Sequence, residues 1–227
     1  MKKTVKSAFI ATIPVLTGYL VLGFGFGIIL KSAGYGILLA FVMSFLIYAG
    51  SMQYVAIGLL TGGASIITAA LTTLMVNARH IFYGISMLEK YKGIGKSKPY
   101  LIFSLTDETY SLVCSDNPEI DSAQRKNYYL FVSLFNHAYW VVGSVIGAIT
   151  GTLIKFNTEG IDFALTALFV TVFLEQWLTA KKHIPAIIGV AISVLCLVVL
   201  GSDNFLIPSM LIIALILCLY KEERENG

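Results

Sequence analysis

Four polar side chains interrupt an apolar run at residues 74–84, LMVNARHIFYG: Asn77, Arg79, His80 and Tyr83. Spacings of three and four residues place Asn77, His80 and Tyr83 on one face of a helix, while Arg79 points elsewhere unless the helix is broken. A guanidinium group inside a membrane costs at least roughly 2.5 kcal/mol and needs a partner or water. In the alternative interpretation, the Arg79 side chain extends to the cytoplasmic interface beside Lys90, and His80 bonds to a buried carbonyl group. The four residues together predict a polar, substrate-binding site.

A second group, in the stretch IYAGSMQY at residues 47–54, adds Gly50, Ser51 and Gln53. Glycine costs about 1 kcal/mol inside a helix, and a serine side chain can compete for backbone hydrogen bonds. The pair can therefore open a helix and offer backbone N–H and C=O groups to a polar substrate, provided that protein or water covers them. Close helix packing through small residues, with Gln53 bonded to a neighbour, is the alternative. We include these three residues among the candidate substrate-binding residues.

A third group is the acidic pair Asp107 and Glu108 in SLTDETY, residues 104–110. Burial favours the protonated form of a carboxyl group, so the pair can take part in proton coupling. The two acids can also bind a substrate ammonium group, or act as the counter-charge of Arg79. In the alternative interpretation, Thr106 caps a helix whose first turn holds both acids.

The second half of the chain carries scattered polar residues. Asn136 and His137 lie within an apolar stretch, and we expect His137 to form a hydrogen bond between helices. Asp162 and Glu175, which is followed by Gln176, are expected to mark two membrane interfaces. The sequence contains no catalytic triad, P-loop or metal-ligand spacing, and its three cysteines are far apart. We therefore expect neither an enzyme nor a cofactor.

The elements that must position these residues are apolar helices. Of the 227 residues, 57% are hydrophobic and 13% are charged, and the mean hydropathy is +0.81. This composition predicts an all-α polytopic membrane protein with one domain, residues 1–227. Two further stretches, 64–88 and 99–115, are interrupted by polar residues. Six stretches have the length of a full transmembrane helix: 8–30, 36–60, 128–154, 161–180, 184–200 and 205–220.

The distribution of basic residues bears on the number of crossings. With a cytoplasmic N-terminus and eight crossings, nine Lys and Arg residues lie inside and six outside, leaving Arg79 uncounted. If 64–88 and 99–115 are partial or re-entrant, the numbers become thirteen and two. Because basic residues concentrate in the cytoplasm, we predict six full crossings plus two partial, re-entrant or broken segments, and both termini inside. In this arrangement the run 64–88 turns back at Asn77. Eight crossings stay an alternative.

A weak internal repeat is also present. GILLAFVMSF, residues 36–45, aligns with GIDFALTALF, residues 160–169, at an offset of 124. Repeats of this kind are common in transporters, where the site lies at their interface. The chain can therefore be divided into repeat halves at 1–115 and 125–227.

Four stretches together resemble the AzlC family of branched-chain amino acid exporters: YAGSMQYVAIGLL, LMVNARHIFYGIS, SLTDETYSL and GIDFALTALFV. The resemblance covers roughly residues 5 to 220. It implies export of valine, leucine, isoleucine and analogues across the bacterial plasma membrane. It also implies a small hydrophobic partner subunit of the AzlD type.

The residues and the resemblance together predict a secondary transporter driven by an ion gradient, with protons as the expected ion. Arg79, or the N–H groups opened at Gly50 and Ser51, can bind the substrate carboxylate. Asp107 or Glu108 can bind the ammonium group. His80 or one of the carboxylates can change protonation during the cycle. An uncoupled membrane channel or permease for small amphipathic solutes is the alternative.

Overall fold

The regular elements in the described part of the chain are all helical, in agreement with the predicted fold class. The chain divides into two compact units, residues 1–159 and residues 160–227. The computed structural model describes residues 2–114, 120–121, 124–153, 170, 173–174, 177–178, 180, 183–201, 205, 208–209, 211–213 and 215–217.

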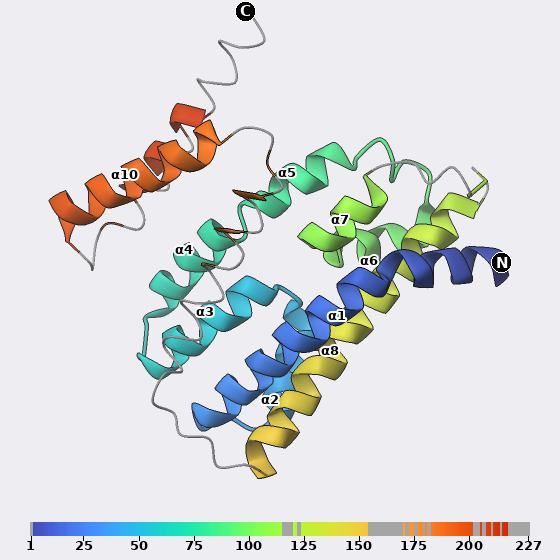
Figure 1. Cartoon of the computed structure of the whole chain (residues 1–227), viewed down its shortest axis with the longest axis horizontal. Helices are drawn as coiled ribbons and strands as arrows, with labels where there is room; N and C mark the ends of the chain where they lie inside the picture. The colour runs from blue at the N-terminus through green and yellow to red at the C-terminus, as the bar shows by residue number, and fades with distance from the viewer. Residues whose placement is uncertain are drawn as a thin grey trace, which may run out of the picture. The chain divides into compact units, whose positions relative to one another are not determined.

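Two long helices form the frame of the first unit. Helix α1 (Lys2–Ser32) and helix α8 (Arg125–Leu153) are, within the described residues, the two that are long and apolar enough to cross a membrane. They contain the predicted stretches 8–30 and nearly all of 128–154. They lie side by side and run in the same direction (Figure 1). Phe9 packs on Phe135 near their N-terminal ends, and Thr12 lies 3.2 Å from Tyr139.

Glycines allow the two long helices to approach backbone to backbone. A Cβ atom added at Gly27 would overlap the carbonyl oxygen of Ser144, and one added at Gly147 would overlap the carbonyl oxygen of Phe24. Small residues four apart are the usual means of close helix packing in membranes. The seam therefore holds α1 and α8 firmly together, and two other segments, residues 37–61 and 98–113, pack against this pair of helices.

The next segment is a hairpin. Helix α2 (Ile37–Val42) continues into a π-helical turn, η1 (Met43–Ile47), the chain reverses at Tyr48 and Ala49, and helix α3 (Gly50–Thr61) runs back. Across the reversal, the Gln53 amide donates a hydrogen bond of 3.3 Å to Ser44 Oγ. In a continuous helix these two residues would lie roughly 13 Å apart along the axis. We call residues 37–61 the first hairpin.

The prediction that residues 36–60 form one full transmembrane helix is wrong. The reversal lies directly before Gly50 and Ser51, the pair from which helix opening was predicted. Tyr48 has a φ of 47°, in the left-handed region that residues with a side chain seldom adopt. Such a conformation persists where surrounding contacts hold it, and Tyr48 is 3% exposed. Packing around Tyr48 therefore sets the position of the break, and the run of apolar residues in the sequence does not reveal it.

The run 64–88 contains helix α4 (Ile66–Val76) and helix α5 (Arg79–Ser86). Ser65 caps α4 through its Oγ, which accepts a hydrogen bond of 3.1 Å from the Thr68 N–H. The helix is broken at Asn77 and Ala78, but Ala78 keeps helical dihedral angles and α5 leads onward from the end of α4 (Figure 1). The predicted break is thus present. The predicted turn back at Asn77 is wrong, because the backbone there only kinks.

A second hairpin follows the loop after α5. A short 3₁₀ turn, η2 (Gly95–Ser97), leads into helix α6 (Lys98–Phe103), and helix α7 (Asp107–Val113) returns. Tyr100 on α6 contacts His137 in the middle of α8, whereas Val113 at the end of α7 belongs to the same buried cluster as Tyr128 near the start of α8. The predicted partial segment 99–115 is therefore broken and folded back. We call residues 98–113 the second hairpin.

Helix α10 (Ile184–Leu200) belongs to the second unit and has the bounds of the predicted stretch 184–200. Asp162, Glu175 and Gln176 lie outside the described residues. So do residues 160–169, on which the internal repeat depends, most of the predicted stretch 161–180, and seven of the sixteen residues of the predicted stretch 205–220.

Candidate functional site

The tips of both hairpins meet at the kink between α4 and α5. Arg79, the first residue of α5, lies between them. Its Nη1 atom is 2.8 Å from Asp107 Oδ2 at the start of α7, and its Nη2 atom donates a hydrogen bond of 3.0 Å to Ser51 Oγ at the start of α3. The Arg79 guanidinium group therefore contacts two other predicted site residues, Ser51 and Asp107, which lie far from it in the sequence.

The Arg79–Asp107 pair is not sealed inside the protein. The two side chains are 32% and 30% exposed. Arg79 Nε and Asp107 Oδ1 have no hydrogen-bond partner among the described residues, although both atoms are buried. Each partner of the ion pair can accordingly form a further hydrogen bond. A partly exposed pair contributes little net stability, about 0–1 kcal/mol, so it can be exchanged at small cost.

Thr106 fixes the start of α7, where the two acidic residues lie. Its side chain accepts a hydrogen bond of 3.3 Å from the Thr109 N–H and so caps α7. Asp107 and Glu108 then occupy the first turn, where negative charge is favourable. The helix cap and the counter-charge of Arg79, both weighed from the sequence, are confirmed together.

Glu108 faces a different neighbour. Its Oε2 atom accepts a hydrogen bond of 2.6 Å from the Tyr19 hydroxyl, which also lies 2.7 Å from Thr106 Oγ1. Tyr19 comes from the middle of α1 and is 5% exposed. It links the tip of the second hairpin to the frame. Sequence reasoning missed Tyr19, because one tyrosine in an apolar helix gives no signal by itself.

Aromatic rings surround the tip of the first hairpin. The Tyr48 ring centroid lies 4.3 Å from that of His137 and 6.5 Å from that of Tyr19. Phe103, at the tip of the second hairpin, lies 6.3 Å from Tyr48 between centroids. The buried Tyr48 hydroxyl has no hydrogen-bond partner among the described residues. Of these rings, the sequence singled out His137 alone.

Gln53 and Gly50 brace the first hairpin. The Trp140 indole N–H donates a hydrogen bond of 2.8 Å to Gln53 Oε1, and Gln53 is fully buried. A Cβ atom at Gly50 would lie 3.0 Å from the Trp140 ring, tighter than ordinary packing. Both residues lie beside the site, as predicted. Their contact with a substrate stays a prediction, and the geometry gives them a supporting role.

Asn77, His80 and Tyr83 hold the kink. Asn77 ends α4, and its carbonyl oxygen lies 3.1 Å from His80 Nδ1. The Tyr83 ring is 6.0 Å from the His80 ring and stacks on Tyr110 of α7 at 4.7 Å. The structure thus places the three residues next to Arg79 and gives them contacts within α5 or toward α7. Direct substrate binding by any of them stays a prediction.

His137 forms a hydrogen bond between helices, as predicted. Its Nδ1 atom lies 3.1 Å from the Tyr100 hydroxyl, which ties α8 to α6. Its neighbour Asn136 donates a hydrogen bond of 3.0 Å to Thr109 Oγ1 on α7. Both halves of the second hairpin are therefore attached to α8.

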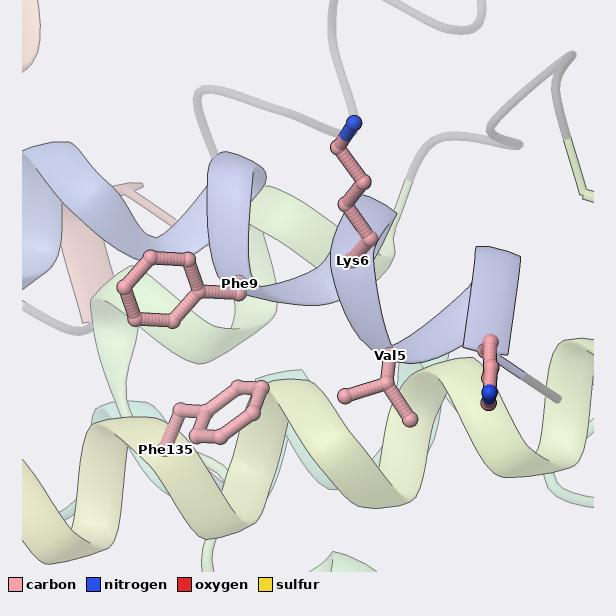
Figure 2. Close-up of a pocket in the computed structure, with 5 residues that line it drawn as sticks. Val5, Lys6, Phe9 and Phe135 are labelled. Atoms are coloured by element: carbon pink, nitrogen blue, oxygen red, sulfur yellow. The ribbon is translucent and has the colours of Figure 1, made fainter.

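A groove of about 430 Å³ lies elsewhere on the first unit. Figure 2 shows Phe9 and Phe135 facing each other between α1 and α8, while the Lys6 side chain points away from Phe135. Phe9 precedes Tyr19 by ten residues, roughly 15 Å along a helix. The groove contains none of the predicted site residues. Its lining residues are Lys2, Val5, Lys6, Phe9 and Phe135.

Within the described residues, no group of three or more His, Cys, Asp or Glu side chains is placed to hold a metal ion.

Comparison with known proteins places these features in a family context. The family model described as "AzlC protein" matches residues 14–154, which include the whole candidate site. The chain is 47% identical over 223 residues to the "Branched-chain amino acid transport protein AzlC" of Bacillus subtilis (strain 168), with 98% of this chain and 87% of that protein covered.

More distant relatives are also membrane proteins by name. An "Uncharacterized membrane protein" of Haemophilus influenzae is 44% identical over 215 residues, covering 93% of this chain and 87% of its own. The "Inner membrane protein YgaZ" of Escherichia coli (strain K12) is 29% identical over 172 residues, covering 73% and 70%. No solved structure matches the chain.

Proposed function

The chain belongs to the AzlC family and is an all-helical membrane protein, and from this premise we propose that it exports branched-chain amino acids across the bacterial plasma membrane. The substrates are valine, leucine, isoleucine and analogues. Transport is driven by an ion gradient, with protons as the coupling ion. The family carries transport and no enzymatic activity.

The observation that carries the proposal is the Arg79–Asp107 ion pair at the meeting point of three helix ends. An amino acid zwitterion presents one carboxylate and one ammonium group, the chemical counterparts of these two side chains. The substrate replaces the internal pair: its carboxylate binds Arg79, and its ammonium group binds Asp107. The exchange conserves the number of ion pairs, so the partly exposed internal pair is given up at small cost.

Neighbouring groups complete the substrate site. Ser51 Oγ and the first-turn N–H groups of α3, which have no carbonyl partner within the helix, add donors for the carboxylate. Phe103, which is 42% exposed, offers apolar ring surface to the aliphatic side chain. Broken helices whose ends meet in the middle of the protein are the usual form of such sites in secondary transporters.

Loss of the internal pair also changes the structure of the site. Because Arg79 joins the first hairpin to the second through Ser51 and Asp107, a substrate that takes over its contacts loosens the link between the two tips. The tips can then separate toward one membrane face. We propose this release as the step that allows alternating access.

A small hydrophobic membrane subunit of the AzlD type is proposed as the partner. This proposal rests on the family resemblance. Purification of the tagged chain from its native membrane is expected to bring down one small hydrophobic subunit. Recovery of an active chain without any such subunit would contradict it.

Valine efflux tests the proposed function. Cells loaded with a valine-containing dipeptide are expected to export valine, and Arg79→Ala and Asp107→Asn should each lower the efflux rate at least tenfold at equal amounts of protein in the membrane. Lys92→Ala is the control, since Lys92 forms an exposed ion pair with Glu89 outside the site. Normal efflux by both site variants would overturn the assignment of the site.

An ionophore distinguishes coupled export from the alternative function, an uncoupled channel. Collapse of the proton gradient should slow a coupled exporter while the valine concentration gradient is unchanged. A channel would continue at the rate set by valine alone.

A further inference from the structure

We infer that Glu108 is the group that binds and releases the coupling proton, whereas its neighbour Asp107 stays ionised as the partner of Arg79. The inference rests on the proposed proton-coupled export and divides the two adjacent carboxylates between two tasks. It also assigns Tyr19 and Thr106 as positioning residues for the proton.

The first observation is that the two carboxylates face different elements. Successive residues of a helix point about 100° apart, so Asp107 faces α5 while Glu108 faces α1. Asp107 Oδ2 lies 2.8 Å from the Arg79 guanidinium group. Glu108 contacts no cation among the described residues, and its Oε2 atom accepts a hydrogen bond from the Tyr19 hydroxyl.

The second observation is a chain of hydroxyl groups behind Glu108. The Tyr19 hydroxyl lies 2.7 Å from Thr106 Oγ1, which lies 3.1 Å from Thr109 Oγ1. The chain ends on Asn136 of α8, whose amide donates to Thr109 Oγ1. The Tyr19 and Thr106 hydroxyl groups each carry one proton that can rotate between two neighbours, and Thr109 Oγ1 accepts at the end of the chain.

This chain is satisfied in either protonation state of Glu108. With Glu108 ionised, Thr106 donates to Tyr19 and Tyr19 donates to Glu108. With a proton on Glu108, the direction reverses: Glu108 donates to Tyr19, Tyr19 to Thr106, and Thr106 to Thr109. The proton adds to the carboxylate and only hydroxyl rotations follow, so no buried group loses its partner.

Protonation of Asp107 would have a different consequence. A neutral Asp107 no longer forms an ion pair with Arg79, which would leave a partly buried guanidinium group with Ser51 as its other contact. An ion pair is therefore lost when Asp107 is protonated, whereas none is lost when Glu108 is protonated. The proton therefore goes to Glu108.

The ionisable groups around Glu108 do not offer it another cation. Arg79 is occupied by Asp107, and His137 is held by the Tyr100 hydroxyl on the far side of Tyr48. The remaining ones are phenols from the packed elements. Within the described residues, the set consists of Tyr19 from α1, Tyr48 from the first hairpin, Arg79 and Tyr83 from α5, Asp107 from α7 and His137 from α8.

The proton is linked to movement through Tyr19. A hydrogen bond to an ionised carboxylate is stronger than one between neutral groups, so ionised Glu108 holds the tip of the second hairpin more firmly to α1. Because α1 is fixed to α8 by the glycine seam, a change in this hydrogen bond acts on the tip of the hairpin. Protonation of Glu108 thus weakens the contact between the hairpin tip and α1. Substrate binding likewise weakens the contact between the tip and Arg79.

Two assays on the full chain in proteoliposomes separate proton coupling from substrate binding. Valine–valine exchange at equal pH on both sides needs no net proton movement. Net valine transport driven by an imposed pH gradient does need net proton movement. Glu108→Gln should keep exchange within about threefold of wild type, and should lower gradient-driven transport at least tenfold and abolish its pH dependence. Asp107→Asn should lose both activities.

Two further variants sharpen the test. Glu108→Asp keeps a titratable group and should restore part of the gradient-driven transport, whereas Tyr19→Phe should shift its pH profile while exchange continues. Gradient-driven accumulation by Glu108→Gln would overturn the inference, and so would loss of exchange together with net transport. A wild-type protein whose valine flux ignores the pH gradient would overturn the proposed coupling, while one that moves no valine would overturn the proposed function itself.

Discussion

Arg79 connects more of the site than any other predicted residue. Its planar guanidinium group reaches Asp107 and Ser51 at the same time, with separate nitrogen atoms. A lysine ammonium group is a compact charge on a flexible chain and does not reproduce this fork. The geometry of the guanidinium group, and not its charge alone, therefore sets the spacing of the two hairpin tips.

A conservative substitution measures this contribution. Arg79→Lys should lower valine efflux roughly tenfold to hundredfold, because the loss of a hydrogen bond to a charged group costs about 1.5–3 kcal/mol. Ser51→Ala should have a smaller effect, since the Arg79–Asp107 pair persists. Efflux rates normalised to membrane protein provide the comparison. Ser51→Thr keeps the hydroxyl group and is the matched control; an Arg79→Lys variant as active as this control would contradict the bridging role.

Sequence reasoning identified the charged residues of the site and missed most of its aromatic ones. Arg79, Asp107 and Ser51 stood out because polar groups are rare in apolar stretches. Tyr19 and Tyr48 did not, because tyrosine is common in such stretches and its role depends on a neighbour distant in sequence. The contact between Tyr19 and Glu108 joins residues 89 positions apart, a pairing that no local pattern reveals.

At the scale of elements, the two hairpins and the kinked α4–α5 segment decide the arrangement. Helices α4 and α5 have 11 and 8 residues, and with the two residues between them they extend roughly 30 Å, the thickness of the hydrocarbon core. The first hairpin returns to the end from which it started. We therefore propose that residues 66–86 cross the membrane and that residues 37–61 are re-entrant, the reverse of the sequence prediction.

The charge distribution could not separate these two arrangements. In both of them Lys31 lies outside and the lysines at 90–98 lie inside, so the bias of basic residues is identical. The difference concerns only the loop at Gly62 and Gly63, which carries no charge. The interruptions within 64–88 and 99–115 were predictable from their polar residues, but the left-handed Tyr48 that reverses the chain within 36–60 was not.

Cysteine labelling of this loop distinguishes the arrangements. In a variant without native cysteines, a cysteine at Gly63 should react with a membrane-impermeant reagent from outside, as should one at Gly36. A cysteine at Gly93 should react only after the membrane is opened. The sequence-based arrangement places residue 63 in the cytoplasm, so labelling at 63 only in opened cells would contradict the revised topology.

The glycine seam makes a prediction about stability. Gly27→Ala should destabilise the protein by about 1–3 kcal/mol, because the added methyl group overlaps the Ser144 carbonyl oxygen and forces α1 and α8 apart. Gly18→Ala is the matched control in the same helix, since no atom of the described residues lies within 4 Å of its added Cβ. Thermal unfolding in detergent measures both. Equal stability of the two variants would contradict the seam.

At the scale of the whole molecule, the first unit contains the complete candidate site. All residues of the Arg79 and Glu108 networks lie between Tyr19 and Asn136, inside the segment that matches the family model. Helices α1 and α8 begin the two predicted repeat halves and run in parallel, but the internal repeat and the division at 1–115 and 125–227 stay predictions. The role of the second unit, residues 160–227, is likewise open to experiment.

The central claim is that an amino acid zwitterion replaces the Arg79–Asp107 pair, and binding to the purified full chain tests it most directly. Valine should raise the unfolding temperature of the wild-type protein, because a ligand that binds the folded state stabilises it. Isovalerate, which lacks the amine, and isobutylamine, which lacks the carboxylate, should give little protection at the same concentration. Arg79→Ala and Asp107→Asn should abolish the valine effect. Equal protection of wild type and both variants by valine would contradict the claim.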